Sequence, residues 1–475
     1  MLSTFHPASV VLMKRFMVVL FCAATFSVAA QEVALTSVEE VQKKMNDLEN
    51  QIIKLNKLKV SGFIQTQYQY AEAAADGVNF KLAKGINAYE NSATDGNGDY
   101  KGLSSFSRFG IRRGFLKFTY DEGLASGVAQ IDITDKGLDD NGRNVVMVKD
   151  LYFSIKDPWY GTCFLKTGLF DPPFGYEIAY SSSRLESPER ARIIQSILPD
   201  ERDVGTMITL QPAKTSNWNF LKLDAGFFAG NGIKPQIDSH IDFIGHLSAT
   251  KNIGSNRTIG GGISAYLGGV RQMNDTVYRM DNQRFVAEAS SANNGKFAKR
   301  QYIGFDLQFS MTTSAGWTQL RGEYIFGEHP GNSSGAYNFR LTGLQSGPVF
   351  MRKIRGGYVI LVQEFGQSPF SAVLKYDWYN PNTDISGNAI ASQELVTGAA
   401  DKATNTGDIT KSNFGVGLLW RINAALRLTA YYDFVGNEKT QNIANQKDDS
   451  GHLIAYGYEG NRKDNVFTLR LQYRF

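Results

Sequence analysis

The feature that most constrains this chain is a two-residue alternation of apolar and polar side chains, repeated in segment after segment. The last segment shows it clearly, because Phe467, Leu469, Leu471, Tyr473 and Phe475 alternate with polar residues. Successive side chains of a β-strand point to opposite faces, so this pattern predicts a strand with one apolar face and one polar face.

Sixteen such segments follow one another from residue 59 onward, and most approach the ~9–11 residues with which a tilted strand crosses a bilayer. They lie near residues 59–70, 109–120, 126–134, 145–155, 163–170, 204–210, 218–228, 241–250, 257–267, 299–311, 316–326, 353–363, 371–379, 412–421, 426–435 and 465–475. We therefore predict an all-β protein, in which β-strands form most of residues 59–475.

The connections between these segments alternate in length. Short ones such as DEGLA (121–125) and INAA (422–425) alternate with long ones such as 171–203 and 380–411. Outer-membrane barrels have long extracellular loops and short periplasmic turns. The pattern predicts a 16-stranded antiparallel transmembrane β-barrel with both ends periplasmic, whereas the linkers of a secreted β-sandwich, the alternative, would show no such bias.

The first thirty residues have the features of a secretory signal peptide. From Met13, two basic residues precede an apolar run and then small residues, which predicts cleavage after Ala30. A membrane anchor is the alternative, but the apolar run is too short to span comfortably. Removal of this segment takes Cys22 with it and leaves Cys163 without a partner for an internal disulfide.

Residues 31–58 form a different kind of segment, in which apolar residues recur at steps of three and four. This spacing predicts a short periplasmic coiled coil that associates with itself, as a trimer in our interpretation. An amphipathic helix that folds back on its own domain is the alternative. The apolar positions are Val38, Val41, Met45, Leu48, Ile52 and Leu55.

The polar face of each strand is expected to line the lumen, and it carries more basic than acidic residues. Surplus positive charge in a narrow pore raises the local concentration of anions. The alternative is mixed charge that only holds water and braces the wall. The predicted anion path comprises Arg113, Lys117, Lys166, Lys375 and Arg421 from the wall, with Arg184 and Arg192 from the third long loop.

This third loop, near 171–203, also contains SPER, which predicts a short helix with Ser187 as its N-cap. Arginine offers planar, multi-donor contacts to oxyanions. The alternative is that the arginines pair with nearby acids and pin the loop to the wall, and this favours a scaffold of Glu189, Arg190, Arg202 and Asp203. Strict alternation in the second strand would aim Arg112 at lipid, unless a bulge turns it.

Several motifs together resemble the phosphate-selective porin O and P family over most of residues 59–475. They are SRFGIRRGFLKFTY (107–120), GLFDPPFGYE (168–177), SPERAR (187–192), LPDERDVG (198–205), YDWYNPNTD (376–384) and the terminal strand. The resemblance implies a trimeric barrel whose third loop folds inward and narrows the pore. Basic side chains at this narrowing would carry anions through.

The expected function is therefore passive diffusion of small hydrophilic solutes through the outer membrane of a Gram-negative bacterium, with a preference for anions such as phosphate. A non-selective or sugar and zwitterion porin is the alternative, and an anchoring protein that acts through its coiled coil is a third. Expected partners are outer-membrane lipid, two further copies in a homotrimer, small anions, and the barrel-assembly machinery through Phe475. No nucleic acid is expected.

Neither an enzyme nor a metal or cofactor site is predicted. His240, His246, His329 and His452 accompany no G-x-S-x-G or H-E-x-x-H motif. The turn DGNGDYKG, which begins at Asp95, has the first oxygen spacings of a calcium loop but lacks its glycine and its final glutamate. A solvated turn explains that sequence better.

Overall fold

A computed structural model describes residues 41–47, 57–74, 102–133, 146–234, 236, 238–335 and 347–475. The predicted signal peptide and the turn at Asp95 lie outside these residues. Of the predicted coiled coil, residues 41–47 form a helix in which Val41 and Met45 are exposed, and most of the segment lies outside the described part. Self-association of this segment therefore stays a prediction.

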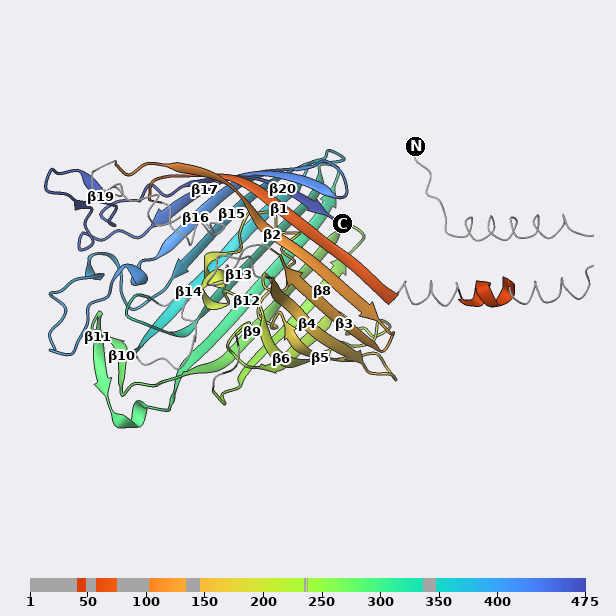
Figure 1. Cartoon of the computed structure of the whole chain (residues 1–475), viewed down its shortest axis with the longest axis horizontal. Coiled ribbons are helices and arrows are strands. Elements are labelled where there is room, and N and C mark those ends of the chain that lie inside the picture. Colours follow the sequence, from red (N-terminus) through yellow and green to blue (C-terminus); the bar gives the residue numbers. More distant parts are fainter. Residues whose placement is uncertain are drawn as a thin grey trace, which may run out of the picture. The chain divides into compact units, whose positions relative to one another are not determined.

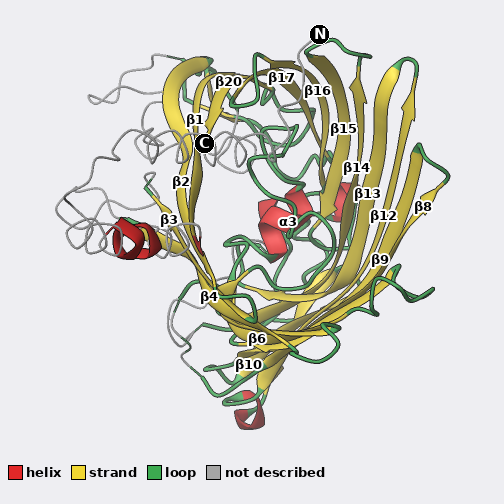
Figure 2. Cartoon of the chain, turned by 90° about the vertical axis from the view of Figure 1, so that its right-hand side faces the viewer, coloured by secondary structure: helices red, strands yellow, loops and turns green. Residues whose placement is uncertain are grey.

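Sixteen antiparallel strands form one closed barrel. Figures 1 and 2 show the arrangement of these strands around the barrel. They are β1 (Leu58–Ala71), β2 (Phe106–Asp121), β3 (Ala125–Asp132), β4 (Met147–Lys156), β5 (Cys163–Phe170), β6 (Asp203–Leu210), β7 (Leu221–Phe228), β8 (Asp242–Ile253), β9 (Arg257–Arg271), β12 (Phe297–Thr313), β13 (Gly316–Gly331), β14 (Val349–Glu364), β15 (Phe370–Asn380), β16 (Lys411–Arg421), β17 (Leu426–Asn437) and β20 (Val466–Arg474). Each corresponds to one predicted segment, so the predicted barrel is confirmed.

The barrel closes where the last strand pairs with the first. β20 lies between β17 and β1, and its register with β1 runs from Phe63 opposite Arg474 to Ala71 opposite Val466. Backbone bonds of 3.0 and 3.1 Å between Gly62 and Phe475 extend this ladder by one pair. Closure leaves no unpaired edge among the sixteen described strands of the wall, which a sheet in hydrocarbon requires.

The connections alternate in length as predicted. At one end of the barrel, turns such as 254–256, 314–315 and 422–425 are short. At the other end the loops are long and carry structure that the sequence did not predict: the hairpin of β10 (Thr276–Asp281) and β11 (Arg284–Ala289), the pair β18 (Gln446–Lys447) and β19 (Leu453–Ala455), and the 3-10 turns η2 (Ser291–Asn293), η3 (Gly387–Ala389) and η4 (Thr406–Asp408).

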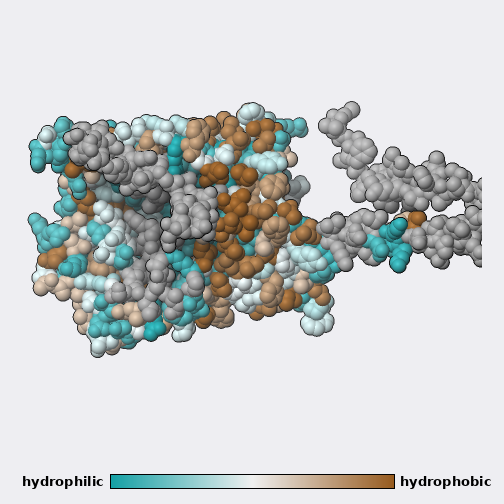
Figure 3. Space-filling model, viewed as in Figure 1, coloured by the Kyte–Doolittle hydropathy of each residue, from teal (hydrophilic) through white to brown (hydrophobic). Residues whose placement is uncertain are grey.

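The barrel wall has an apolar outer face and a polar inner face. In β20, Leu469, Leu471 and Tyr473 are 36–47% exposed, whereas Arg470 and Gln472 are at most 5% exposed. Figure 3 shows such hydrophobic residues gathered in a broad brown region on the barrel surface. Apolar side chains thus lie outside and polar side chains inside, which is the reverse of a water-soluble protein. A wall of strands that faces lipid requires this arrangement. Among the described residues, no helix combines the length and the apolar run that a membrane-crossing helix needs.

The third long loop, residues 171–202, lies inside the barrel, where Figure 2 shows its helix α3 (Arg192–Ile197) enclosed by strands. Ile193, Ile194 and Ile197 are almost fully buried in one apolar cluster with side chains of the wall, such as Tyr358 and Phe170. Apolar burial thus fixes α3 to the inner wall.

The prediction that Ser187 is the N-cap of this helix is wrong. The helix begins at Arg192, and its N-cap residue, Ala191, makes no side-chain cap. The Ser187 hydroxyl instead donates to the carbonyl of Glu189 at 2.8 Å. The Pro188 carbonyl, which would enter the helical ladder, accepts from the wall residue Arg470 at 2.7 Å. Residues 187–189 therefore form bends that contact the wall instead of a helical turn.

Candidate functional site

The candidate site is the interface between the third loop and the wall, and its central contact is a carboxylate held by three arginines. Glu189 accepts two hydrogen bonds from Arg112, at 2.6 and 2.7 Å, and one from Arg113 at 3.1 Å. Arg470, on β20, contributes a third guanidinium at 3.4 Å. A single loop residue thus bridges β2 and β20, two strands that flank β1.

The electrostatics of this cluster favour an ionised glutamate. Burial by itself would raise the pKa of Glu189, but the guanidinium groups of Arg112, Arg113 and Arg470 outweigh it and hold that pKa well below its ordinary value. Charge-assisted hydrogen bonds of this kind are among the strong ones in proteins. The loop is therefore pinned by ionic bonds as well as by apolar packing.

Further ion pairs join the loop to other strands. Glu186 pairs with Arg321 of β13, and Arg202 pairs with Asp150 of β4. Glu201 lies 3.3 Å from Lys149 of β4 and 2.9 Å from Arg190 of the loop itself. Burial opposes ionisation of Glu201, but the neighbouring cations, Arg190 first, hold its pKa well below the ordinary value.

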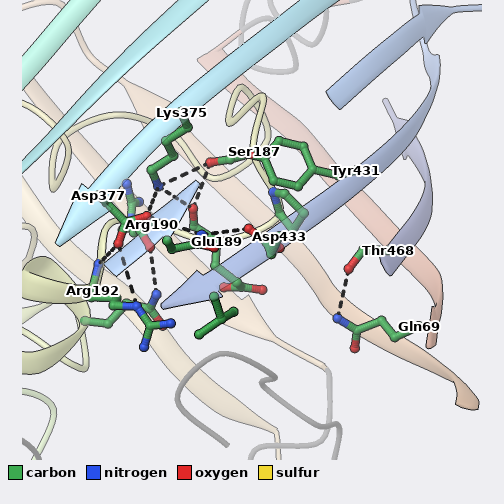
Figure 4. Close-up of a pocket in the computed structure, with 14 residues that line it drawn as sticks. Gln69, Ser187, Glu189, Arg190, Arg192, Lys375, Asp377, Tyr431, Asp433 and Thr468 are labelled. Atoms are coloured by element: carbon green, nitrogen blue, oxygen red, sulfur yellow. Dashed lines mark hydrogen bonds and ion pairs between the residues drawn. The ribbon is translucent and has the colours of Figure 1, made fainter. Parts of the chain in front are cut away.

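A small cavity beside Glu189 shows how closely the loop meets β15 and β17 (Figure 4). The Lys375 ammonium donates to the Glu189 carbonyl at 3.0 Å and lies 3.9 Å from the Asp377 carboxylate. The backbone N–H of Arg192 donates to the same carboxylate at 3.1 Å. The cavity measures about 30 Å³, which leaves room for a water molecule but not for a solute of several atoms.

The residues predicted to form the anion path fall into two groups. Five have an acidic partner: Arg113 with Glu189, Lys166 with Asp171, Arg192 and Lys375 with Asp377, and Arg421 with Glu364. Lys117 lies opposite Gln130, which is buried and faces the lumen, so Lys117 faces the lumen too. Arg184 is exposed and makes no ion pair among the described residues.

The predicted scaffold residues lie among these contacts. Glu189, Arg190 and Arg202 make the ion pairs described above, and Arg190 also donates to the backbone carbonyl of Tyr180 at 2.9 Å. Asp203 begins β6 and accepts from the backbone N–H of Gly230 at 2.9 Å, so it fastens the end of the loop to the next connection.

Arg112 differs from what strict alternation predicts. The outward residues of β2 are odd-numbered early in the strand, at Phe109 and Ile111, and even-numbered later, at Phe118 and Tyr120. The phase therefore changes in the middle of the strand, which allows Arg112 and Arg113 both to reach Glu189. The shift of the apolar residues from odd to even positions, on either side of the consecutive arginines, is the signal of this change in the sequence.

A second, larger pocket lies at the end of the barrel with short turns, where loop residues between 180 and 186 form part of its lining. It has a volume of about 250 Å³, and the turn 423–425 forms part of its lining. Four arginines line it: Arg184, Arg421, Arg427 and Arg474. The sequence analysis assigned Arg421 to the wall and Arg184 to the third loop but did not place the two in one pocket.

Two carboxylates also line this pocket, and each already has a partner. Glu364 pairs with Arg421, and Glu186 pairs with Arg321. Within the described part of the chain, Arg184, Arg427 and Arg474 make no ion pair. These three arginines therefore give the pocket positive charge that is not balanced by an ion pair with a described carboxylate of the loop or the wall.

The histidines lie apart and each has its own neighbour. His246 lies 2.9 Å from Asp306, His240 lies 3.6 Å from Asp242, and His452 lies 3.0 Å from Asp448. His329 contacts the Tyr302 hydroxyl. Among the residues that the structure describes, no group of three or more His, Cys, Asp or Glu side chains is placed to hold a metal ion.

Comparison with known proteins returns similar folds only. No family model matches the sequence, and no curated protein matches it. Among solved structures, the chain is similar to OprB of Pseudomonas putida at high pH (9% identity, 90% of this chain and 96% of that chain, TM-score 0.49). It is also similar to the outer membrane channel DcaP of Acinetobacter baumannii (10% identity, 88% and 97%, TM-score 0.47).

A third structure is the trimer form of OmpT, an outer membrane protein of Vibrio cholerae (10% identity, 88% of this chain and 99% of that chain, TM-score 0.46). At such identities and TM-scores, the likeness carries no functional conclusion. The fold of this chain is established by its own strand pairing.

Proposed function

We propose that this protein is an outer-membrane porin through which small hydrophilic solutes diffuse passively. The observation that carries the proposal is a closed sixteen-stranded wall, apolar outside and polar inside, whose lumen is narrowed by a loop fastened to several strands. An inverted polarity of this kind needs lipid around the wall. A loop inside the lumen leaves a restricted aqueous path, which suits a filter for small solutes.

The location and assembly belong to the same proposal. The barrel would lie in the outer membrane of a Gram-negative bacterium, with the short turns and both chain ends on the periplasmic side. The proposal also includes assembly as a homotrimer, recognition of Phe475 by the barrel-assembly machinery, and a periplasmic coiled coil before β1. Each is separable from pore formation and needs its own test.

We further propose a preference for anions, supported by the pocket at the short-turn end. Positive charge that no carboxylate neutralises raises the local anion concentration, and it does so most where the path is narrow. Arg184 and Arg474 supply such charge. The more specific form of this proposal is a preference for phosphate among anions. The sequence between Thr167 and Thr209, which includes the third loop, contributes no lysine to such a preference.

A non-selective pore is the second candidate, and one observation favours it. Most basic residues of the loop and the facing wall are paired with acids, so the narrow region has little free charge. Under this alternative the arginine pocket affects only the entry of ions at the short-turn end of the pore.

A planar-bilayer measurement separates these functions. We expect discrete conductance steps from purified protein, and a reversal potential across a KCl gradient that favours chloride. A reversal potential near zero would replace the anion preference with the non-selective pore, and absence of channels would overturn the porin assignment. Addition of phosphate then tests the finer proposal, since a phosphate site would reduce the chloride current at millimolar concentration.

A further inference from the structure

The pocket of about 250 Å³ at the short-turn end has two walls of different chemistry. One wall comprises the arginines described above. The other includes Trp317, Val362 and Leu419, from the inner faces of β13, β14 and β16. Apolar side chains on the inner face of a barrel are unusual, because this face normally meets water.

The arginine wall has unused hydrogen-bonding capacity. Arg427 donates from Nη2 to the Leu185 carbonyl at 2.8 Å, but its buried Nε has no acceptor. Arg184 and Arg474 are exposed at the pocket and make no ion pair among the described residues. A guanidinium binds a planar oxyanion through two parallel bonds, which makes these three side chains suitable for a carboxylate.

The apolar wall determines which class of anion the pocket binds, because it favours anions that have a carbon body. Val362 and Leu419 are only 2% and 5% exposed, so they form the base of this wall and offer a solute little open surface. The ring of Trp317, which is partly buried and packs against the same apolar cluster, supplies more of the surface that a solute can cover. A solute with a carbon body gains free energy by covering such a surface, whereas inorganic phosphate cannot. The volume lies just below the ~300–1,000 Å³ of typical small-molecule sites, which fits a solute of few carbon atoms.

We propose that this pocket is a binding site for small organic carboxylates. The carboxylate group lies against Arg184, Arg427 and Arg474, and the carbon body lies against Trp317, Val362 and Leu419. This inference rests on the proposed pore for its biological role, since the site would then lie at one end of the diffusion path. Binding itself does not depend on conduction.

The test uses the full-length protein with benzoate as the probe, and with inorganic phosphate and benzyl alcohol as comparators. Isothermal titration calorimetry in detergent measures binding, and planar bilayers measure conductance and block. We expect benzoate to bind more tightly than either comparator, because only benzoate meets both walls. In the double variant R184Q/R474Q we expect binding at least about tenfold weaker, since two charge-assisted contacts are lost.

Arg279→Gln is the matched control, because Arg279 is an exposed arginine of the β10–β11 hairpin (the outer hairpin) and lies outside the pocket. Should the double variant fail to fold, the single variant R184Q, whose side chain is exposed, serves in its place. Equal binding by phosphate and benzoate would overturn the carboxylate assignment, and so would benzoate binding that the variants leave unchanged. No benzoate binding by a conducting protein would overturn the site altogether.

The outcomes also separate this inference from the proposed function. Benzoate binding by a protein that forms no channel would support the pocket and overturn the pore. A conducting protein whose current benzoate reduces in the wild type, but not in R184Q/R474Q, would support both.

Discussion

The lumen contains two clusters of three arginines that differ in what surrounds them. Arg112, Arg113 and Arg470 converge on one loop carboxylate, Glu189. At the short-turn end, Arg184, Arg427 and Arg474 surround an open pocket and make no ion pair among the described residues. The first cluster holds a loop in place, and the second remains available to a solute. The number of basic residues in a lumen therefore says little until the acids are placed.

The substitution with the largest expected effect is Glu189→Gln, which removes the acid from the first cluster. Three buried guanidinium groups would lose their counter-charge, and breaking such a buried pair typically costs ~3–5 kcal/mol. We expect the part of the third loop around Glu189 to leave the wall, the single-channel conductance to rise, and the thermal unfolding temperature to fall. Planar bilayers and thermal unfolding in detergent measure these effects.

Glu288→Gln is the control for that experiment, because Glu288 pairs with Arg279 in the outer hairpin and is about half exposed. The control should keep the wild-type conductance. If Glu189→Gln also kept it, the three-arginine cluster would not be what holds the loop.

Acidification should act on the first cluster only at low pH. The folded-state pKa of Glu189 and of Glu201 is lowered, so their stabilisation is complete above the ordinary glutamate pKa and is lost as pH falls through the lowered one. We expect wild-type conductance to be constant from about pH 7 to about pH 4.5 and to rise only below that window. A rise near pH 6 would show that other groups hold the loop.

The second cluster should control ion selectivity with little effect on stability. In R184Q/R474Q, removal of two unpaired charges should lower the anion-to-cation permeability ratio, by about twofold, because the surplus positive field is reduced. Reversal potentials across a KCl gradient measure this ratio. The same ratio in wild type and variant would mean that this pocket lies off the ion path.

The smallest effect is expected for Arg279→Gln, which breaks an ion pair whose two side chains are 51% and 54% exposed. Exposed pairs contribute at most ~1 kcal/mol, and often nothing measurable. Conductance, selectivity and unfolding temperature should all remain close to wild type. A change in selectivity would show that the outer hairpin contributes to the ion path.

The strands were predictable from the sequence because each one carries its own signal. A period of two within about ten residues identifies a two-faced strand without knowledge of its neighbours. The contact between Arg112 and Glu189, 77 positions away, was not predictable from the sequence. The apolar residues of β2 change from odd to even positions within the strand, and a strict alternation counted from the later positions overlooks this change. Strict alternation therefore aimed Arg112 in the wrong direction.

The site was less predictable for a related reason. The third loop was expected to fold inward from the family resemblance, but which acid meets which base depends on its path across the lumen. Arg470 and Glu189 are 281 positions apart. The helix start at Arg192 was also hidden, because local capping rules favoured Ser187, whereas the Pro188 carbonyl accepts a hydrogen bond from the wall residue Arg470 instead of entering a helix.

The seam between β1 and β20 has a consequence for the order of assembly. Gln65 and Gln472 meet across this seam at 2.7 Å although 407 positions separate them. Until the final strand has been made, β1 and β17 each present an unpaired edge, and neither edge is tolerated in hydrocarbon. Nearly the whole polypeptide must therefore be synthesised and kept from aggregating before the last ladder can form, so closure of the barrel has to wait for the end of synthesis.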